Sequence, residues 1–138
     1  MNICSKVVLL VDDSPTVRRM LDWSLKSLGV KTVHAGDGFE ALEVIKTRDV
    51  DLAIVDLNMP HMDGIELIRS MRGIQRLKSL PIILLTTEGR EEDRELAYDA
   101  GANLFMTKPS TPTLLRLNAS AFLGIPDSAQ PELGKANS

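Results

Sequence analysis

Short apolar segments alternate with longer amphipathic segments through most of the chain, and this alternation recurs five times. Three of the short segments are almost wholly apolar, which is typical of parallel strands that are covered on both faces. The alternation predicts a (βα)₅ chain of the α/β class, because parallel strands joined by right-handed helical crossovers form a doubly wound sheet. The expected strands are Lys6–Val11, Lys31–Ala35, Leu52–Val55, Ile82–Leu85 and Leu104–Met106.

The amphipathic segments carry apolar residues at helical spacing, which predicts one stripe per helix facing the sheet. The segment Glu91–Ala100 is the most charged, and we expect this fourth helix to pack most loosely. The expected stripes are Val17, Met20, Leu21, Leu25 and Leu28 in the first helix, Ala41, Leu42 and Ile45 in the second, Ile65, Ile68 and Met71 in the third, Leu96, Ala97 and Ala100 in the fourth, and Leu114, Leu117 and Ala121 in the fifth.

Residues that begin and end helices agree with these boundaries. Ser14 followed by Pro15 suits an N-cap and first helical position, and two Asp/Glu pairs have the spacing of a capping box. Glycines that follow helix ends favour a left-handed conformation there. The capping-box pairs are Asp37 with Glu40 and Asp63 with Glu66, and the glycines are Gly29, Gly101 and Gly124.

The length of 138 residues suits one domain, since about 150 residues per domain is usual. We expect a single domain over residues 1–123. From residue 124 to 138 the chain turns polar, contains Pro126 and Pro131 and has no periodicity, so this stretch is predicted to be a flexible tail or the start of a linker.

Composition excludes several classes of protein. With 43% hydrophobic and 25% charged residues, the chain is neither disordered nor a disulfide scaffold, and Cys4, the one cysteine, has no predicted role. The net charge of −3 argues against binding nucleic acid. The longest apolar run, Val7–Val11, is far shorter than the roughly 18 residues of a membrane span, and Met1 to Lys6 lacks the charged-then-apolar layout of a signal peptide. We therefore expect a cytoplasmic protein that binds neither nucleic acid nor membranes.

Polar residues follow four of the expected strands: Asp12 and Asp13 the first, Asp56 the third, Thr86 the fourth, and Thr107 and Lys108 the fifth. All these strand ends share one edge of the sheet. In the usual order 2-1-3-4-5, the first and third strands are neighbours about 4.8 Å apart, so the three carboxylates should meet in one pocket.

Three converging carboxylates repel one another unless a cation lies between them. Mg²⁺ suits oxygen ligands, takes one or two carboxylates, and completes its shell with water and phosphate oxygens. Lys108 adds a fixed positive charge and Thr86 a hydroxyl donor. Together these groups form a site that binds a phosphoryl group and neutralises its charge during transfer.

The chain resembles a response-regulator receiver domain of the chemotaxis-regulator type. The resemblance spans Lys6 to about Leu123, and it implies a flavodoxin-like sheet in the order 2-1-3-4-5. The matching segments are LLVDDSPTVRRML, DLAIVDLNMPHMDGIELI, PIILLTTEG and GANLFMTKP.

The resemblance implies a role for each group at the strand ends. Asp56 would be the phosphoacceptor, which takes a phosphoryl group from the phosphohistidine of a sensor histidine kinase or from a small donor. A relay that passes the phosphoryl group on to a histidine phosphotransfer protein is the alternative. Asp13 and Asp56 would bind Mg²⁺ directly, Asp12 through water, and Asn58 through its main-chain carbonyl. Lys108 would pair with the phosphoryl oxygens.

The resemblance also implies a switch. Phosphorylation adds about −1.5 to −2 charges; the Thr86 hydroxyl would turn toward them, the Phe105 ring would move inward, and the face formed by the fourth helix, fifth strand and fifth helix would signal to an unidentified protein. A cis peptide is expected at Lys108–Pro109. The protein would phosphorylate and dephosphorylate itself, without being a classical enzyme, and we expect a monomer.

Several residues depart from the family pattern. Thr87 is bulkier than the small residue found in many members, Phe105 lacks the phenol of motor-binding members, and the acidic run at residues 90–95 argues against flagellar-switch binding. The resemblance implies that Asn58 and Glu88 sit at the two variable positions that tune the attack of water on the phosphoryl group. Both are polar and could orient that water, so we expect a short-lived phosphorylated form.

Simpler readings and rival functions remain open. Taken singly, Asp12 and Asp13 would be read as helix-capping residues and Lys108 as a solvated lysine. His34 and His61 have no second ligand at metal spacing, so we expect both to be structural or exposed. A dinucleotide site is disfavoured, because the aspartates after the first strand would repel phosphate. A Mg²⁺-dependent phosphohydrolase is a more serious rival, but such enzymes carry Asp-x-Asp after the first strand, where this chain has two adjacent aspartates. An interaction module that is never phosphorylated is the third alternative.

Overall fold

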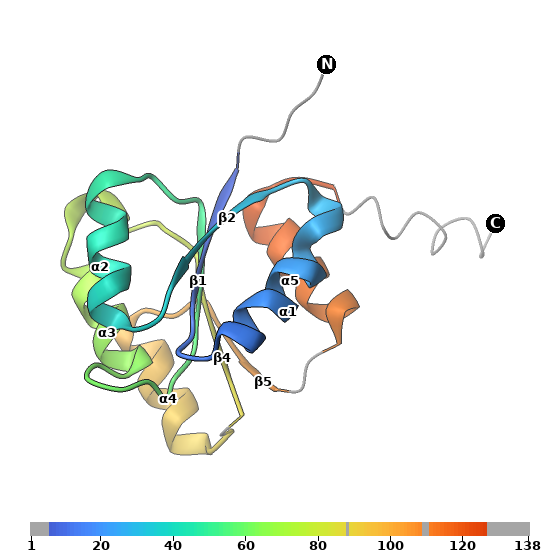
Figure 1. The fold of residues 1–138 in the computed structure, drawn as a ribbon. Helices are drawn as coiled ribbons and strands as arrows, with labels where there is room; N and C mark the ends of the chain where they lie inside the picture. The colour runs from blue at the N-terminus through green and yellow to red at the C-terminus, as the bar shows by residue number, and fades with distance from the viewer. Residues whose placement is uncertain (1–5, 88, 109–110, 127–138) are drawn as a thin grey trace.

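The computed structural model describes residues 6–87, 89–108 and 111–126 and shows a five-stranded parallel sheet in the order β2-β1-β3-β4-β5 (Figure 1). This confirms the predicted doubly wound, flavodoxin-like α/β fold. The strands are β1 (Val7–Val11), β2 (Lys31–Ala35), β3 (Leu52–Val55), β4 (Ile82–Thr86) and β5 (Leu104–Thr107).

Helices cover both faces of the sheet. Helices α1 and α5 lie on one face and pack on the core around Leu10, Leu25 and Leu115, whereas α2, α3 and α4 cover the other face (Figure 1). Across the described parts of the chain, no helix is long and apolar enough to cross a bilayer. The helices are α1 (Pro15–Leu25), continued by the short 3₁₀ helix η1 (Lys26–Leu28), α2 (Gly38–Thr47), α3 (Gly64–Arg72), then η2 (Gln75–Leu77), α4 (Glu91–Ala100) and α5 (Pro112–Leu123).

The register of β1 and β3 brings their carboxyl ends level. Val11 lies opposite Val55, and the Asp56 N–H donates to the Val11 carbonyl oxygen at 2.9 Å. Asp12 and Asp56, the residues that follow, therefore leave the sheet side by side. Strands β4 and β5 each run one residue further than predicted, so Thr86 is the last residue of its strand and Lys108 follows directly after Thr107.

Most of the predicted helix boundaries are confirmed. Ser14 caps α1, and Asp63 and Glu66 form a complete capping box at α3. At α2, Asp37 accepts from the Glu40 N–H, but the Glu40 carboxylate accepts from Gly36 instead of Asp37, so the predicted capping box is only half formed. Left-handed φ angles are found at Gly29 (74°), Gly101 (119°) and Gly124 (69°).

Three predicted helix stripes are wrong, those of α1 and α4 in part and that of α5 completely. Met20 on α1 is 63% exposed and Leu96 on α4 is 44% exposed, and on α5 the stripe of Leu114, Leu117 and Ala121 faces solvent. On α5 the buried residues are Leu115, Ala119, Ser120 and Leu123. This helix carries two overlapping apolar stripes, and helical spacing alone does not tell which one packs against α1 and the sheet.

Candidate functional site

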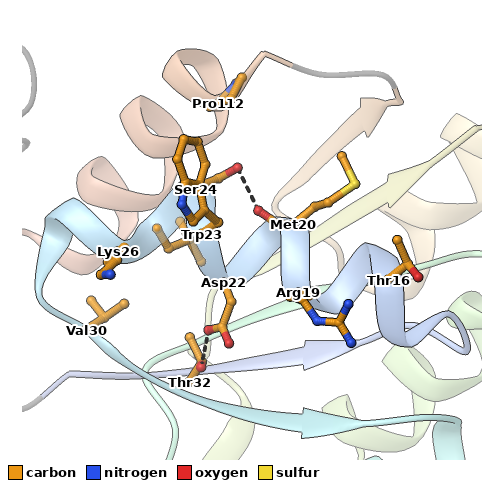
Figure 2. Close-up of a pocket in the computed structure, with 11 residues that line it drawn as sticks. Thr16, Arg19, Met20, Asp22, Trp23, Ser24, Lys26, Val30, Thr32 and Pro112 are labelled. Carbon is orange, nitrogen blue, oxygen red and sulfur yellow. Dashed lines mark hydrogen bonds between the residues drawn. The ribbon is translucent and has the colours of Figure 1, made fainter.

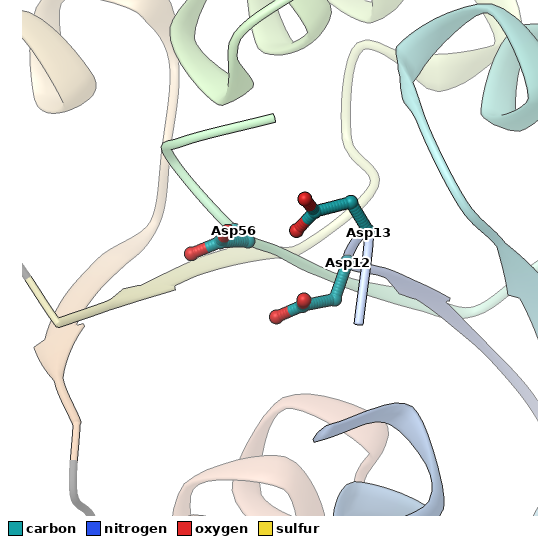
Figure 3. Close-up of side chains that lie close together, drawn as sticks. All are labelled: Asp12, Asp13 and Asp56. Atoms are coloured by element: carbon teal, nitrogen blue, oxygen red, sulfur yellow. The ribbon is translucent and has the colours of Figure 1, made fainter. Parts of the chain in front are cut away.

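Three carboxylates meet at the carboxyl ends of β1 and β3. One carboxylate oxygen from each of Asp12, Asp13 and Asp56 lies within 4.8 Å of the others (Figure 3). Asp12 is 3% exposed and Asp56 8% exposed, whereas Asp13 is exposed to solvent. Among the described residues, this is the one cluster of three or more metal-ligating side chains.

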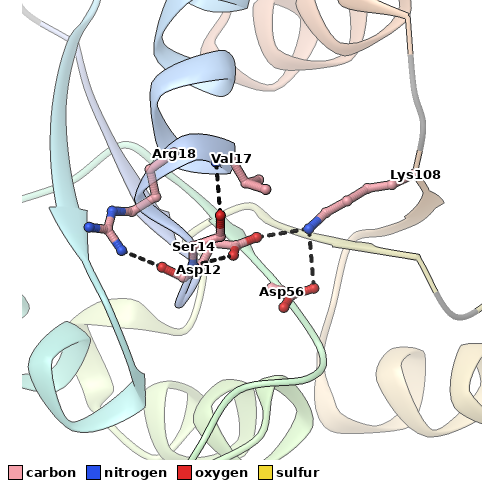
Figure 4. Close-up of polar contacts among 6 residues, drawn as sticks. All are labelled: Asp12, Ser14, Val17, Arg18, Asp56 and Lys108. Carbon is pink, nitrogen blue, oxygen red and sulfur yellow. Dashed lines mark hydrogen bonds and ion pairs between the residues drawn. The ribbon is translucent and has the colours of Figure 1, made fainter.

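Asp12 is held in place by its own main chain and by α1. Its Oδ1 accepts from the Ser14 N–H at 2.9 Å, and its main-chain N–H donates to the Ala35 carbonyl at 3.1 Å. The guanidinium of Arg18 donates to the Asp12 carbonyl (Figure 4). Sequence reasoning missed Arg18, because an arginine on a helix surface carries no signal of such a contact.

Lys108 joins two of the carboxylates from the other side of the pocket. Its Nζ lies 2.8 Å from Asp12 Oδ2 and 3.4 Å from Asp56 Oδ1, and its side chain is only 16% exposed (Figure 4). Its main-chain N–H donates to the Thr86 carbonyl at 2.6 Å, which ties Lys108 to the end of β4. The ammonium therefore lies beside the carboxylates with little surrounding water.

Burial raises the pKa of Asp56 from 3.8 to about 6. The positive charge of Lys108 opposes this rise, and the negative charges of Asp12 and Asp13 add to it. At pH 7.5 the carboxylate is therefore still mainly ionised, as its predicted role as a nucleophile requires.

The donor set fits a hard divalent cation. Three carboxylates face a single ammonium, Lys108, so the pocket carries excess negative charge, and every side-chain ligand that it offers to a metal is an oxygen. Asp13 reaches solvent, which leaves room for the several waters that Mg²⁺ retains. The residues present therefore suit Mg²⁺ on grounds of charge and ligand chemistry.

The structure places the other predicted site residues with less detail. Thr86 is fully buried, and its carbonyl contacts Lys108. Asn58 is exposed, two residues beyond Asp56, on the rim of a hollow between α3 and α4. The roles of both stay predictions. Cys4, Glu88 and the peptide Lys108–Pro109 involve positions outside the described residues.

The loop from β3 to α3 passes very close to Asp56. A Cβ atom at Gly64 would lie 2.3 Å from the main-chain oxygen of Asp56, so no larger residue fits there unless the loop moves. The Gly64 N–H also donates to the Leu57 carbonyl at 2.8 Å. Gly64 thus allows α3 to begin directly beneath Asp56.

A large hollow of the described surface lies along α1, away from the carboxylates. It measures about 820 Å³, is mainly apolar, and is bordered by Met20, Trp23 and Pro112 (Figure 2). A smaller hollow of about 330 Å³ shares Met20 and Pro112 with it and extends to Thr87 and Lys108. An apolar surface therefore runs along α1 to the edge of the acidic site.

The two histidines take no part in the site. His34 contacts Asp22 at 3.2 Å and accepts from Arg18 at 3.3 Å, and His61 is exposed in a loop, with a left-handed φ of 72°. Neither belongs to the cluster of metal-ligating residues.

Comparison with known proteins shows similarity over most of the chain. Residues 8–119 match the model of the response regulator receiver domain. Chemotaxis protein CheY1 of Helicobacter pylori is 39% identical over 122 residues, which cover 87% of this chain and 98% of the relative. A CheY homologue of Campylobacter jejuni is 40% identical over 119 residues, which cover 85% and 92% of the two chains.

Solved structures show the same similarity. CheY4 of Vibrio cholerae superposes with a TM-score of 0.82 at 34% identity, over 87% of this chain and 100% of that one. The receiver domain of a sensor histidine kinase from Pseudomonas aeruginosa, which holds a magnesium ion in its active-site cleft, superposes with a TM-score of 0.80 at 28% identity, over 88% and 99% of the two chains.

Proposed function

Because the chain belongs to the response regulator receiver domain family of two-component signalling, we propose that it is a phosphorylation-activated switch with Asp56 as phosphoacceptor. The observation that carries the proposal is the position of Lys108, whose ammonium lies 3.4 Å from Asp56 and 2.8 Å from Asp12 at one edge of the sheet. A nucleophile and a countercharge for phosphoryl oxygens thus stand side by side.

In the proposed reaction a carboxylate oxygen of Asp56 attacks the phosphorus of a phosphohistidine. A bond from oxygen to phosphorus forms as the phosphorus–nitrogen bond breaks, and the leaving imidazole keeps the electron pair and takes a proton from water. Lys108 neutralises charge on the transferred phosphoryl oxygens. Because its ammonium is already largely desolvated beside Asp56, little reorganisation is needed during transfer.

A magnesium ion would be held by Asp13 and Asp56, with Asp12 acting through water and Asn58 through its main-chain carbonyl. Bound there, the ion supplies positive charge between the carboxylates and the phosphoryl oxygens. The excess negative charge of the carboxylate cluster supports this assignment.

The phosphodonor would be a sensor histidine kinase or a histidine phosphotransfer protein, both of which present a histidine on a protein surface. The apolar strip along α1, where Met20 is 63% and Trp23 73% exposed, supports docking of such a protein next to Lys108. The chain would act as a monomer in the cytoplasm and pass the signal to an unidentified protein.

The signal would leave through Thr86 and Phe105 to the face formed by α4, β5 and α5. The contact between Lys108 and the Thr86 carbonyl supports this route, because it links the phosphoryl site to the end of β4. We further propose that the receiver unit spans residues 1–123 and that 124–138 are a tail or the start of a linker; of these residues, 1–5 and 127–138 lie outside the described part of the chain. The end of α5 at Leu123 and the family match over residues 8–119 support this boundary.

Members of this family are phosphoacceptors rather than classical enzymes. Here, self-phosphorylation from small donors and self-dephosphorylation are part of the proposal, with a short-lived phosphorylated form as the expected result. A lifetime of many hours for the phosphorylated wild type would reject the short-lived form.

Intact-mass spectrometry after incubation with acetyl phosphate and Mg²⁺ tests the proposal. We expect one phosphoryl adduct on the wild type and on Asp99→Asn, a matched carboxylate-to-amide change at an exposed position of α4, and none on Asp56→Asn. An adduct that survives Asp56→Asn, or no adduct on the wild type, would refute the assignment. Catalytic turnover of an organic phosphate ester would instead favour the phosphohydrolase alternative.

A further inference from the structure

Helix α4 contacts the open edge of the sheet through a tyrosine hydroxyl. β5 is the last strand of the sheet, so one of its edges has no neighbouring strand, and alternate N–H groups of such an edge point away from the sheet. The Phe105 N–H donates to the Oη of Tyr98 at 3.1 Å. Tyr98 therefore satisfies a main-chain donor at the residue that the family resemblance marks as the switch.

Arg94 strengthens the same contact from one turn earlier on α4. Its guanidinium lies 5.6 Å from the centre of the Tyr98 ring and 5.8 Å from the centre of the Phe105 ring. Both distances are within the range of cation–π attraction. One side chain thus links the aromatic ring of α4 to that of β5, and we call Arg94 and Tyr98 together the α4 latch.

The latch lies over a ring that is buried. Phe105 is 5% exposed and packs in the same core as Ala97 and Ala100 of α4, whereas Tyr98 is 38% exposed and Arg94 is exposed. The exposed pair therefore covers the buried ring. For the Phe105 ring to move outward, its contact with Arg94 would have to break, and Tyr98, which the hydrogen bond to the Phe105 main-chain N–H holds in place, would have to give way.

We propose that the α4 latch sets the position of Phe105, with Tyr98 and Arg94 as positioning residues that favour the buried ring. Position 105 has no phenol of its own, and Tyr98 supplies one from the neighbouring helix. The link to signalling rests on the proposed function, in which the position of Phe105 is coupled to phosphorylation of Asp56 through Thr86. Any change that moves α4 should therefore also change the position of Phe105.

The expected size of the effect follows from the contacts. Loss of one neutral hydrogen bond shifts a two-state equilibrium about fivefold. Loss of an exposed cation–π contact shifts it about two- to fivefold. The ratio of exposed to buried Phe105 should therefore rise by about those factors in Tyr98→Phe, which deletes only the hydroxyl, and in Arg94→Gln, which removes the charge.

Fluorine NMR of protein labelled with 4-fluorophenylalanine measures this ratio. The change in fluorine chemical shift between H₂O and D₂O increases with the exposure of a ring to solvent. The chain has three phenylalanines, and Phe39, which is exposed, provides the internal reference for an exposed ring. Asp99→Asn, an exposed change on the same helix, is the matched control. We expect the Phe105 signal to become more solvent-sensitive in both latch variants and to stay unchanged in the control.

Beryllofluoride with Mg²⁺, which mimics a bound phosphoryl group, separates positioning from simple structural support. If Tyr98 positions the switch, beryllofluoride should return the Phe105 signal of Tyr98→Phe to its buried value. A Phe105 signal that is the same in wild type, Tyr98→Phe and Arg94→Gln overturns the latch. The latch is also overturned if beryllofluoride binds the wild type but does not return the Phe105 signal of Tyr98→Phe to its buried value. Failure of the wild type to react with acetyl phosphate would refute the proposed function but leave the comparison of variants without beryllofluoride to decide the latch.

Discussion

Replacing Asp56 by asparagine should stabilise the metal-free protein, although it removes the phosphoacceptor. Burial raises the pKa of this carboxyl group from 3.8 to about 6, so between these pH values the native state binds more protons than the unfolded state. The free energy of unfolding then decreases as pH rises through this window, because the carboxyl group ionises at lower pH in the unfolded state than in the native state. Asparagine keeps the shape of the side chain without its charge.

The size of the gain depends on pH. A pKa difference of about two units corresponds to about 3 kcal/mol once both states are ionised, which holds at pH 7.5. At pH 4.5 the unfolded carboxyl is largely ionised while the native one is protonated, and the same relation leaves a gain of about 1 kcal/mol. The midpoint of unfolding of Asp56→Asn should therefore lie at a higher urea concentration than that of the wild type at both pH values, with the larger difference at pH 7.5.

Urea unfolding in EDTA, followed by circular dichroism, measures both differences, and Asp99→Asn at an exposed site provides the control for an added amide. Added Mg²⁺ should stabilise the wild type more than Asp56→Asn, because binding to the native state alone raises its stability. A gain that is equal at the two pH values, or a loss of stability at pH 7.5, would show that the charge of Asp56 is not destabilising and would refute the reasoning.

Three further substitutions test other parts of the site. Lys108→Met should slow phosphorylation by acetyl phosphate by about 100-fold, the usual loss when one charge-stabilising donor is removed, and single-turnover mass spectrometry checks it; an unchanged rate would exclude Lys108 from the transfer. Gly64→Ala should destabilise the fold by about 2 kcal/mol or more, measured by urea unfolding, because the new Cβ would meet the Asp56 carbonyl at 2.3 Å; wild-type stability would mean that the loop shifts freely. Trp23→Ala should weaken binding of a phosphohistidine protein donor about fivefold or more and leave the rate of phosphorylation by acetyl phosphate unchanged. An equal loss with both donors would place Trp23 in the chemistry instead of the docking surface.

The acidic cluster could be predicted because it needs only strand ends and strand order. Asp12 and Asp56 each follow an apolar strand, and parallel strands place such residues at one edge whatever the side chains elsewhere. The contact of Lys108 with both carboxylates needed coordinates, because a lysine side chain is long enough to reach several partners. The contact from Arg18 to the Asp12 carbonyl also left no trace in the spacing of residues.

The helices show where periodicity stops being informative. Ile65, Ile68 and Met71 of α3 are all buried as expected, since this helix has a single apolar stripe beside its capping box. The fifth helix offers two stripes, and the predicted one, which contains Leu114, is exposed, because packing against α1 selects the other. Tyr98 gave no sign of its contact with β5 for a similar reason, since only the distance between α4 and the sheet edge decides it.

The amino-acid sequence by itself determined the class of fold, which follows from local periodicity, and its motifs implied the strand order through their resemblance to a family. With that order, the common direction of parallel strands gathers the acidic residues at one sheet edge. Only the tertiary structure decided which helix faces are buried, which charges pair, and how Asp56 is desolvated. Those properties depend on distances between elements that are far apart along the chain, and burial, the main cause of the raised Asp56 pKa, exists only once the sheet and helices have packed together.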